Sequence, residues 1–213
     1  MNTSPKPRGR PKALDRERVL EIATMQYWSH GPADISVNDI CATAQVSKPG
    51  LYREFGSDDG LKAAALESYQ KLAIAPFLAL LRVDQLATRT VEEIIDFLTQ
   101  GKDALNLPAG CLFVSMRAQR SRLGPKTVEY LDDVRVEFFA SIRTWLEALK
   151  AAGQVAMTTP AHIAAHQFDA LHSGAMRMQV ENVLQQEIKE FLQHGFANLL
   201  GLRADSPIAH PPN

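Results

Sequence analysis

Residues 36–55, SVNDICATAQVSKPGLYREF, carry the clearest structural signal in the chain. Ser36 is followed three residues later by Asp39, which is the pattern of a helix N-cap with an acidic partner. It predicts a short helix that ends near Ala44. Ser47 has the character of a second N-cap and begins another short helix. Two short helices joined by a tight turn predict a helix-turn-helix.

The second of these helices has the composition of a DNA-reading element. Small residues at its start permit a close approach to base edges, Lys48 supplies positive charge, and the Tyr52 hydroxyl suits a phosphate oxygen. The alternative for Tyr52 is a plain core aromatic, and we favour the DNA role. The predicted outward-facing residues are Ser47, Lys48, Pro49, Gly50, Tyr52 and Arg53.

The wider spacing of this region resembles the N-terminal signature of the TetR family. The signature reads Gly31-x3-Ile35-Ser36-Val37-x-Asp39-Ile40, followed by Ala44-x-Val46-Ser47-Lys48-x-Gly50-Leu51-Tyr52-x-x-Phe55. The resemblance implies that residues 47–53 form the recognition helix, with Lys48 and Tyr52 as phosphate anchors. It also implies that Pro49 and Gly50 pack over base edges and that Ser36 meets a phosphate.

Two positions depart from the family pattern. Gln45 occupies a turn position where the family often has glycine, and a positive φ there would cost about 1 kcal/mol. Asp58 and Asp59 replace a segment that frequently carries a lysine, which removes a phosphate contact expected at that point.

Residues 1–14 are rich in Pro, Gly and cations, and we expect a basic disordered arm. Its core, RGRP, is also found in AT-hook peptides, and a narrow extended segment with arginines suits an A·T-rich minor groove. Arg8, Arg10 and Lys12 are therefore predicted to contact DNA, the alternative being a solvated charge run.

The rest of the chain has helical periodicity, capping residues and Gly or Pro stops, and no convincing strand. It predicts an all-α fold, in which the helix-turn-helix domain covers residues 15–56 and a larger effector-binding and dimerisation domain covers residues 57–203. Residues 204–213 are expected to be a loose tail. Predicted details include an interruption at Pro76, a helix opened by a capping box at Thr90, and a helix capped by Thr159.

Charge and composition agree with a DNA-binding protein. Residues 1–56 carry eight Lys or Arg against six Asp or Glu, a net of +2, and the remainder carries 15 against 18, a net of −3. Positive charge at one end indicates a polyanionic partner for that end. No apolar run reaches the length of a membrane helix, so a cytoplasmic location is expected. Cys41 and Cys111 form neither a disulfide framework nor a zinc pattern, and buried small residues are favoured over a redox sensor.

The resemblance further implies a homodimer, a pseudo-palindromic operator and a small-molecule effector. Apolar middle helices favour a small hydrophobic or aromatic effector, and no cofactor is expected. The candidate pocket residues are Phe77, Phe97, Phe113, Met116, Phe139, Phe168 and His172. The candidate dimer residues, on two long C-terminal helices, are Phe168, Leu171, Ala175, Ile188, Phe191, Leu192, Gly195, Phe196 and Leu199.

The function predicted from these features is a sequence-specific DNA-binding regulator, with repression as the family default, and not an enzyme. One alternative is an architectural DNA-binding protein without an effector. Another is a metal-dependent enzyme that uses the helix bearing His162, His166 and His172, although polar pocket lining or interface is the favoured reading of these histidines and no metal is expected.

Overall fold

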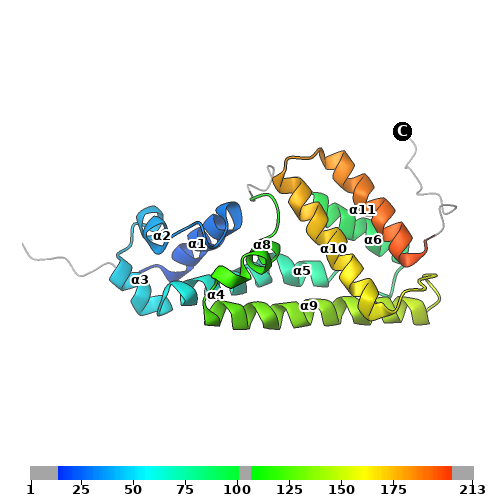
Figure 1. The fold of residues 1–213 in the computed structure, drawn as a ribbon, viewed down its shortest axis with the longest axis horizontal. Helices are drawn as coiled ribbons and strands as arrows, with labels where there is room; N and C mark the ends of the chain where they lie inside the picture. The colour runs from blue at the N-terminus through cyan, green and yellow to red at the C-terminus, as the bar shows by residue number, and fades with distance from the viewer. Residues whose placement is uncertain (1–13, 101–106, 203–213) are drawn as a thin grey trace, which may run out of the picture.

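The computed structural model describes residues 14–100 and 107–202. These residues form helices and connecting loops and contain no strand, which confirms the predicted all-α class. Figure 1 shows an elongated molecule, with α1, α2 and α3 gathered at one end and α10 and α11 toward the other. The long helix α9 runs along one side of the larger domain. The arm residues Arg8, Arg10 and Lys12 and the tail 204–213 lie outside the described residues.

The N-terminal helices are α1 (Arg16–His30), α2 (Val37–Ala44) and α3 (Lys48–Phe55). Their caps are those that the local sequence predicts. The Ser36 side chain accepts from the Asp39 amide while the Asp39 carboxylate accepts from the Ser36 amide, a complete capping box. The three helices share a small core, whose fully buried members include Ala23, Tyr27, Ile40 and Leu51.

Gln45 adopts the left-handed conformation between α2 and α3, with φ 57° and ψ 42°. The positive φ expected at this turn is therefore present, on a residue with a Cβ, and costs about 1 kcal/mol. The turn retains its geometry because the Gln45 amide bonds to the Ala42 and Cys41 carbonyls.

A single long helical stretch connects the two domains. It begins as α4 (Asp58–Tyr69), widens into a π-helical turn (Gln70–Ile74), and ends as α5 (Ala75–Leu78). Pro76 explains the interruption, because it lacks an N–H and its ring collides with the carbonyl four residues earlier in an α-helix. The wider turn, in which the Ala75 amide bonds to the Gln70 carbonyl, avoids that collision.

The helix expected to open at Thr90 begins three residues earlier, as α6 (Ala87–Thr99), so the predicted capping box is wrong. Thr90 is fully buried, and its hydroxyl donates to the Arg82 carbonyl. The cap comes from a distant residue instead, since the Gln154 side-chain oxygen accepts from the Ala87 amide at 2.7 Å.

The described range that begins at residue 107 contains α8 (Leu112–Ala118), a short 3₁₀ turn (Arg120–Arg122) and α9 (Pro125–Ala151). The first turn of α9 is capped by α4. The Asp59 carboxylate accepts from the Lys126 amide at 2.8 Å, the Thr127 amide at 3.0 Å and the Thr127 hydroxyl at 2.6 Å. Asp59, in a segment where the family pattern frequently has a lysine, thus joins α4 to the first turn of α9.

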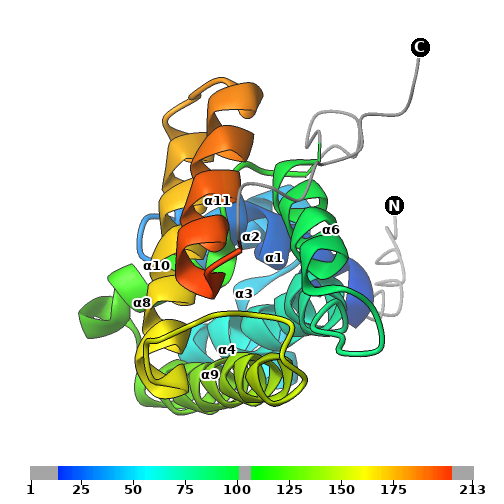
Figure 2. The same cartoon turned by 90° about the vertical axis from the view of Figure 1, so that its right-hand side faces the viewer.

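The final pair is α10 (Ala161–Val180) and α11 (Gln185–Leu200), which lie side by side in Figures 1 and 2. Pro160 is the N-cap of α10, one residue after the predicted Thr159. Both helices pack inward, α10 on α9 and α11 on α6. None of the described helices combines the length and apolar character that crossing a bilayer requires.

Candidate DNA-binding surface and ligand cavity

Helix α3 presents a polar, positively charged outer face. Lys48, Pro49 and Arg53 are exposed, and Tyr52 is half-buried. The Lys48 ammonium lies 5.6 Å from the centroid of the Tyr52 ring, so the two predicted anchors sit together on one side of the helix. Ser47 caps the helix by accepting from the Gly50 amide at 3.2 Å.

Two of the predicted DNA-contact residues also make contacts within the chain. Gly50 is buried, and a Cβ placed on it would lie 3.0 Å from the Ser47 Oγ, the group that caps the helix, and 3.8 Å from Leu14. The Ser36 hydroxyl donates to Asp39 Oδ2 at 2.6 Å, which commits its proton to the helix cap. That hydrogen bond holds the pKa of Asp39 below its usual range.

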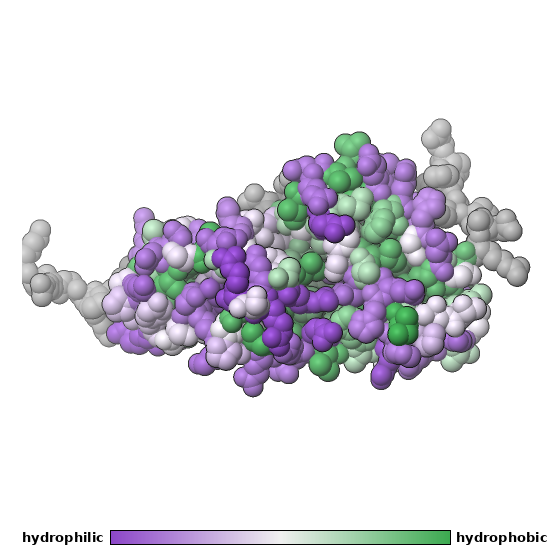
Figure 3. Space-filling view, viewed as in Figure 1, coloured by the Kyte–Doolittle hydropathy of each residue, from purple (hydrophilic) through white to green (hydrophobic). Residues whose placement is uncertain are grey.

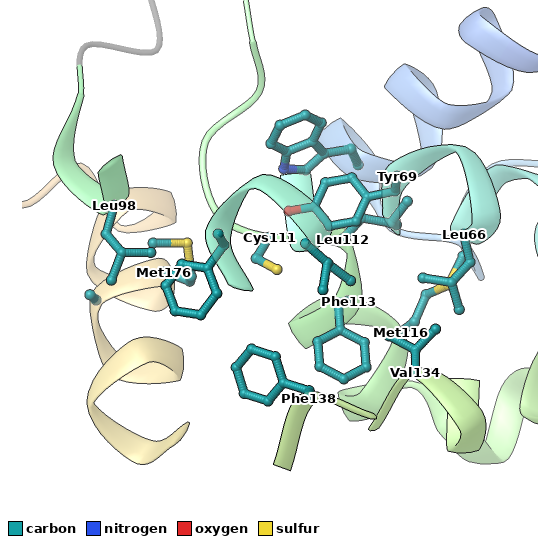
Figure 4. Close-up of a cluster of buried hydrophobic side chains, with 14 of the residues drawn as sticks. Leu66, Tyr69, Leu98, Cys111, Leu112, Phe113, Met116, Val134, Phe138 and Met176 are labelled. Carbon is teal, nitrogen blue, oxygen red and sulfur yellow. The ribbon is translucent and has the colours of Figure 1, made fainter. Parts of the chain in front are cut away.

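The far side of α1 borders an internal cavity of about 230 Å³. Six aromatic side chains line it, contributed by α1, α4, α5, α6, α8 and α9: Trp28, Tyr69, Phe77, Phe97, Phe113 and Phe138. Figure 4 shows Tyr69, Phe113 and Phe138 converging, with Leu98 and Met176 across from them. His172, 5% exposed, completes the ring of aromatics, its centroid 5.7 Å from both Phe77 and Phe138.

Four of the predicted pocket residues line this cavity, namely Phe77, Phe97, Phe113 and His172. Three do not. Met116 and Phe168 are fully buried in the core, where Phe168 packs on Phe196 at 4.9 Å. Phe139 turns away from the cavity to lie 4.6 Å from His166. Its neighbour Phe138 takes the inward position on α9, because consecutive helical residues point about 100° apart.

Sequence reasoning missed Trp28, which joins the cavity to the DNA-binding helices. Its indole N–H donates to the Gly110 carbonyl at 3.1 Å, and its ring meets Tyr69 edge-on at 4.9 Å. The helical periodicity of residues 15–29 predicts one apolar stripe of Val19, Ile22, Ala23 and Tyr27, of which Ile22 is partly buried and the other three are buried. Trp28 follows Thr24 by four residues and belongs to a second buried stripe that faces α4 and α8.

Comparison with known proteins connects this geometry to a family. The family described as "Bacterial regulatory proteins, tetR family" matches residues 19–65, from α1 into α4. The match covers the N-terminal helices, which include the predicted helix-turn-helix. The HTH-type transcriptional repressor ComR of Escherichia coli is 29% identical to it over 111 residues, which are 52% of this chain. The matched stretch spans 53% of that repressor, about half of its length.

Solved structures of other regulators share the fold over most of the chain. A cysteine mutant of CifR, complexed with 26-bp operator DNA, is 23% identical, with a TM-score of 0.72 over 88% of this chain and 97% of that one. A regulator from Saccharomonospora viridis, solved with choline, is 19% identical, with a TM-score of 0.68 over 86% and 95%. At these identities the likeness concerns the fold alone.

The predicted dimer residues divide between two faces of α10 and α11. Five of them, Phe168, Ala175, Ile188, Leu192 and Phe196, are buried inside the single chain and are intrachain core. Four others line a groove of about 540 Å³ on the outer side: Leu171, Phe191, Gly195 and Leu199. The helices touch closely here, since a Cβ on Gly195 would lie 2.3 Å from Leu171.

The three histidines of α10 do not form a metal site. His162 and His166 are exposed, whereas His172 is buried against the aromatic cavity. No group of three metal-ligating side chains occurs in residues 14–100 and 107–202. The geometry therefore gives no support to the alternative of an enzyme built on this helix.

Helix α8 and the turn that follows it contact the DNA-binding end at several points. The Gln119 side-chain oxygen accepts from the Ala33 amide at 3.1 Å, and Arg122 pairs with Asp34 at 3.4 Å. Arg117 forms a bidentate pair with Asp169 of α10, at 2.6 and 2.8 Å, which raises the pKa of the guanidinium. Segment 110–122 thus touches α1, the α1–α2 connection and α10.

Proposed function

We propose that this protein is a TetR-family, sequence-specific DNA-binding regulator that represses transcription in the cytoplasm and is released from its operator by a small effector. One observation carries the proposal. The family-matched segment presents an exposed, positively charged recognition helix, and a separate aromatic cavity borders the same N-terminal helices. The fold is shared with a regulator solved on operator DNA and with another solved with a small ligand.

Lys48 and Tyr52 are the proposed phosphate anchors. Replacing the Tyr52 hydroxyl by hydrogen should weaken operator binding by about 1 kcal/mol, or roughly fivefold, with a similar loss on every operator variant. The test is fluorescence anisotropy with an operator selected from random DNA, comparing Tyr52→Phe with the wild type. Tyr130→Phe is the matched control, because that hydroxyl contacts Gln70 in the larger domain. Equal affinity of wild type and Tyr52→Phe would remove Tyr52 from the interface.

The basic arm is proposed as a second DNA contact, through Arg8, Arg10 and Lys12. Each phosphate contact that releases a counterion adds about 0.9 to the slope of log affinity against log salt. Deletion of residues 1–12 should therefore weaken binding and flatten that slope. A truncated protein with the wild-type slope would show that the arm does not neutralise phosphates.

We propose a homodimer formed through the outer face of α10 and α11, defined by Leu171, Phe191, Gly195 and Leu199. In the view of Figure 3, hydrophobic residues are visible over these two helices. A two-fold dimer places recognition helices about 34–36 Å apart, which matches successive major grooves of a pseudo-palindromic operator. Phe191→Glu should yield monomers in sedimentation experiments, whereas Val136→Glu, on the exposed side of α9, should not. A dimeric Phe191→Glu protein would place the interface elsewhere.

The rival function is an architectural DNA-binding protein without an effector. A sensor gains stability when its ligand binds, so thermal-shift screening discriminates the two. A compound that raises the unfolding temperature and also lowers operator affinity supports the regulator, because the two binding events are then coupled.

A further inference from the structure

The composition of the aromatic cavity indicates the chemistry of its ligand. We propose that it takes an uncharged, single-ring aromatic molecule carrying at most one small polar group, and that this molecule contacts α1 directly through Trp28. The inference rests on the proposed function and specifies its effector. Thirteen of the fifteen lining residues are tryptophan, tyrosine, phenylalanine, aliphatic or methionine side chains or glycine, and the other two are Gln100 and His172.

The size of the cavity limits the ligand to one ring. A dry cavity of about 150 Å³ lined by apolar side chains holds benzene, which has six carbon atoms. By the same ratio, about 230 Å³ holds roughly nine non-hydrogen atoms. Drug-sized ligands need about 300–1,000 Å³. A ring with a short substituent fills this volume, whereas two linked rings would extend beyond the described lining.

The described part of the lining offers no partner for a full charge, since it contains no Asp, Glu, Lys or Arg. Arg117, whose guanidinium lies 5.2 Å from the Phe113 ring, is already held by its bidentate contact with Asp169. A carboxylate or an ammonium ion placed here would lose its hydration without a counter-charge, which is costly. Aromatic faces attract cations, but only partly offset that loss.

Trp28 places the ligand against the DNA-binding end. Its ring lines the cavity while its indole N–H is bonded to Gly110 at the start of segment 110–122. A ring that fills the cavity therefore meets a side chain of α1 and changes the surroundings of that indole. The chain contains two tryptophans, and Trp145 lies apart from the cavity lining, with its N–H bonded to the Arg82 carbonyl at 2.9 Å. A Trp145→Phe variant consequently reports on Trp28 alone.

The experiment uses the full chain and five probes: phenol, benzyl alcohol, the two-ring 4-phenylphenol, benzoate and choline. Phenol and benzyl alcohol should raise the unfolding temperature of the wild type by about 5 °C at saturating concentration. They should also change the emission of the Trp145→Phe variant in a saturable manner. The other three probes should do neither. The wild-type thermal shift does not depend on whether the Trp145→Phe variant folds.

A cavity-filling variant locates the site. Ala73 lines the cavity, whereas Ala75 is exposed two residues later and does not. Ala73→Leu should weaken phenol binding at least tenfold, and Ala75→Leu should leave phenol binding unchanged. Tighter binding of choline or benzoate than of phenol, binding of none of the probes, or equal losses in the two leucine variants would overturn the inference. Failure of the wild type to bind any operator would instead defeat the proposed function, since phenol binding is measured without DNA.

Discussion

Replacement of Gly124 by alanine tests how the DNA-binding end is joined to the larger domain. A Cβ on Gly124 would lie 2.3 Å from the Asp59 Cγ, well inside van der Waals contact. Asp59 cannot move aside freely, because its carboxylate holds the first turn of α9 through the Lys126 amide, the Thr127 amide and the Thr127 hydroxyl. The substitution is therefore expected to break the cap.

The magnitude follows from the bonds that are lost. Loss of an N-cap costs about 0.5–2 kcal/mol, and hydrogen bonds to a charged group contribute about 1.5–3 kcal/mol each. Lys126 is exposed, so water can replace the hydrogen bond that its amide loses. We therefore expect Gly124→Ala to lower the free energy of unfolding by about 2 kcal/mol. For a chain of 213 residues this lowers the unfolding temperature by about 4–8 °C.

The decisive measurement is a double-mutant cycle. Asp59→Ala alone should cost about as much as Gly124→Ala, since both remove the cap. The double variant should be no less stable than Asp59→Ala, because the added methyl group no longer meets a carboxylate. Urea unfolding followed by circular dichroism, at one fixed protein concentration, gives the four free energies. Asp132→Ala is the control on α9, and loss of its exposed pair with Arg120 should cost less than about 1 kcal/mol. Additive losses in the double variant would refute the steric argument.

Three further predictions concern Asp59 and Gly60 of α4 and the turn at Gln45. Burial opposes ionisation of Asp59, but the hydrogen bonds from Thr127 and Lys126 outweigh it and lower its pKa. The wild type should therefore be more stable than Asp59→Ala above about pH 4, the ordinary pKa of a carboxyl group. This difference in stability should vanish as the pH falls through the lower pKa that Asp59 has in the folded chain. Gln45→Gly should raise stability by about 0.5–1 kcal/mol in urea unfolding, because glycine adopts a φ of 57° without strain, and a loss would show that the Gln45 side chain has another role. Gly60→Ala should reduce stability or operator affinity, because the added Cβ would lie 2.0 Å from the Phe55 carbonyl oxygen at the end of α3. Alanine is otherwise the better helix former, so a stabilised variant with normal operator affinity would contradict this steric argument.

The helix-turn-helix could be predicted nearly residue by residue because its determinants are local. The capping box of Ser36 and Asp39, the Ser47 cap and the strained Gln45 turn all depend on residues within five positions of one another. What local sequence could not indicate was the direction in which small residues point. Gly50 is buried, and its nearest neighbours are Ser47 and Leu14.

Helix ends and faces that depend on residues far away in the sequence were predicted less accurately. The start of α6 is fixed by Gln154, 67 positions along the chain, so a plausible local box at Thr90 was misleading. Periodicity likewise gave one apolar stripe for each of α10 and α11. The structure separates an inner row such as Ile188 and Leu192 from an outer row such as Phe191, and only knowledge of the neighbouring helices distinguishes them.

Segment 110–122 explains why a small cavity is well placed to influence the DNA-binding end. At its start the Gly110 carbonyl holds Trp28, in its middle Phe113 forms part of the cavity wall, and at its end Gln119 holds the α1–α2 connection. The bidentate pair between Arg117 and Asp169 fixes the same segment to α10, so it is anchored on both sides of the cavity. Segment 110–122 therefore joins a wall of the aromatic cavity to α1, to the α1–α2 connection and to α10, and Trp28 of α1 is itself part of that wall.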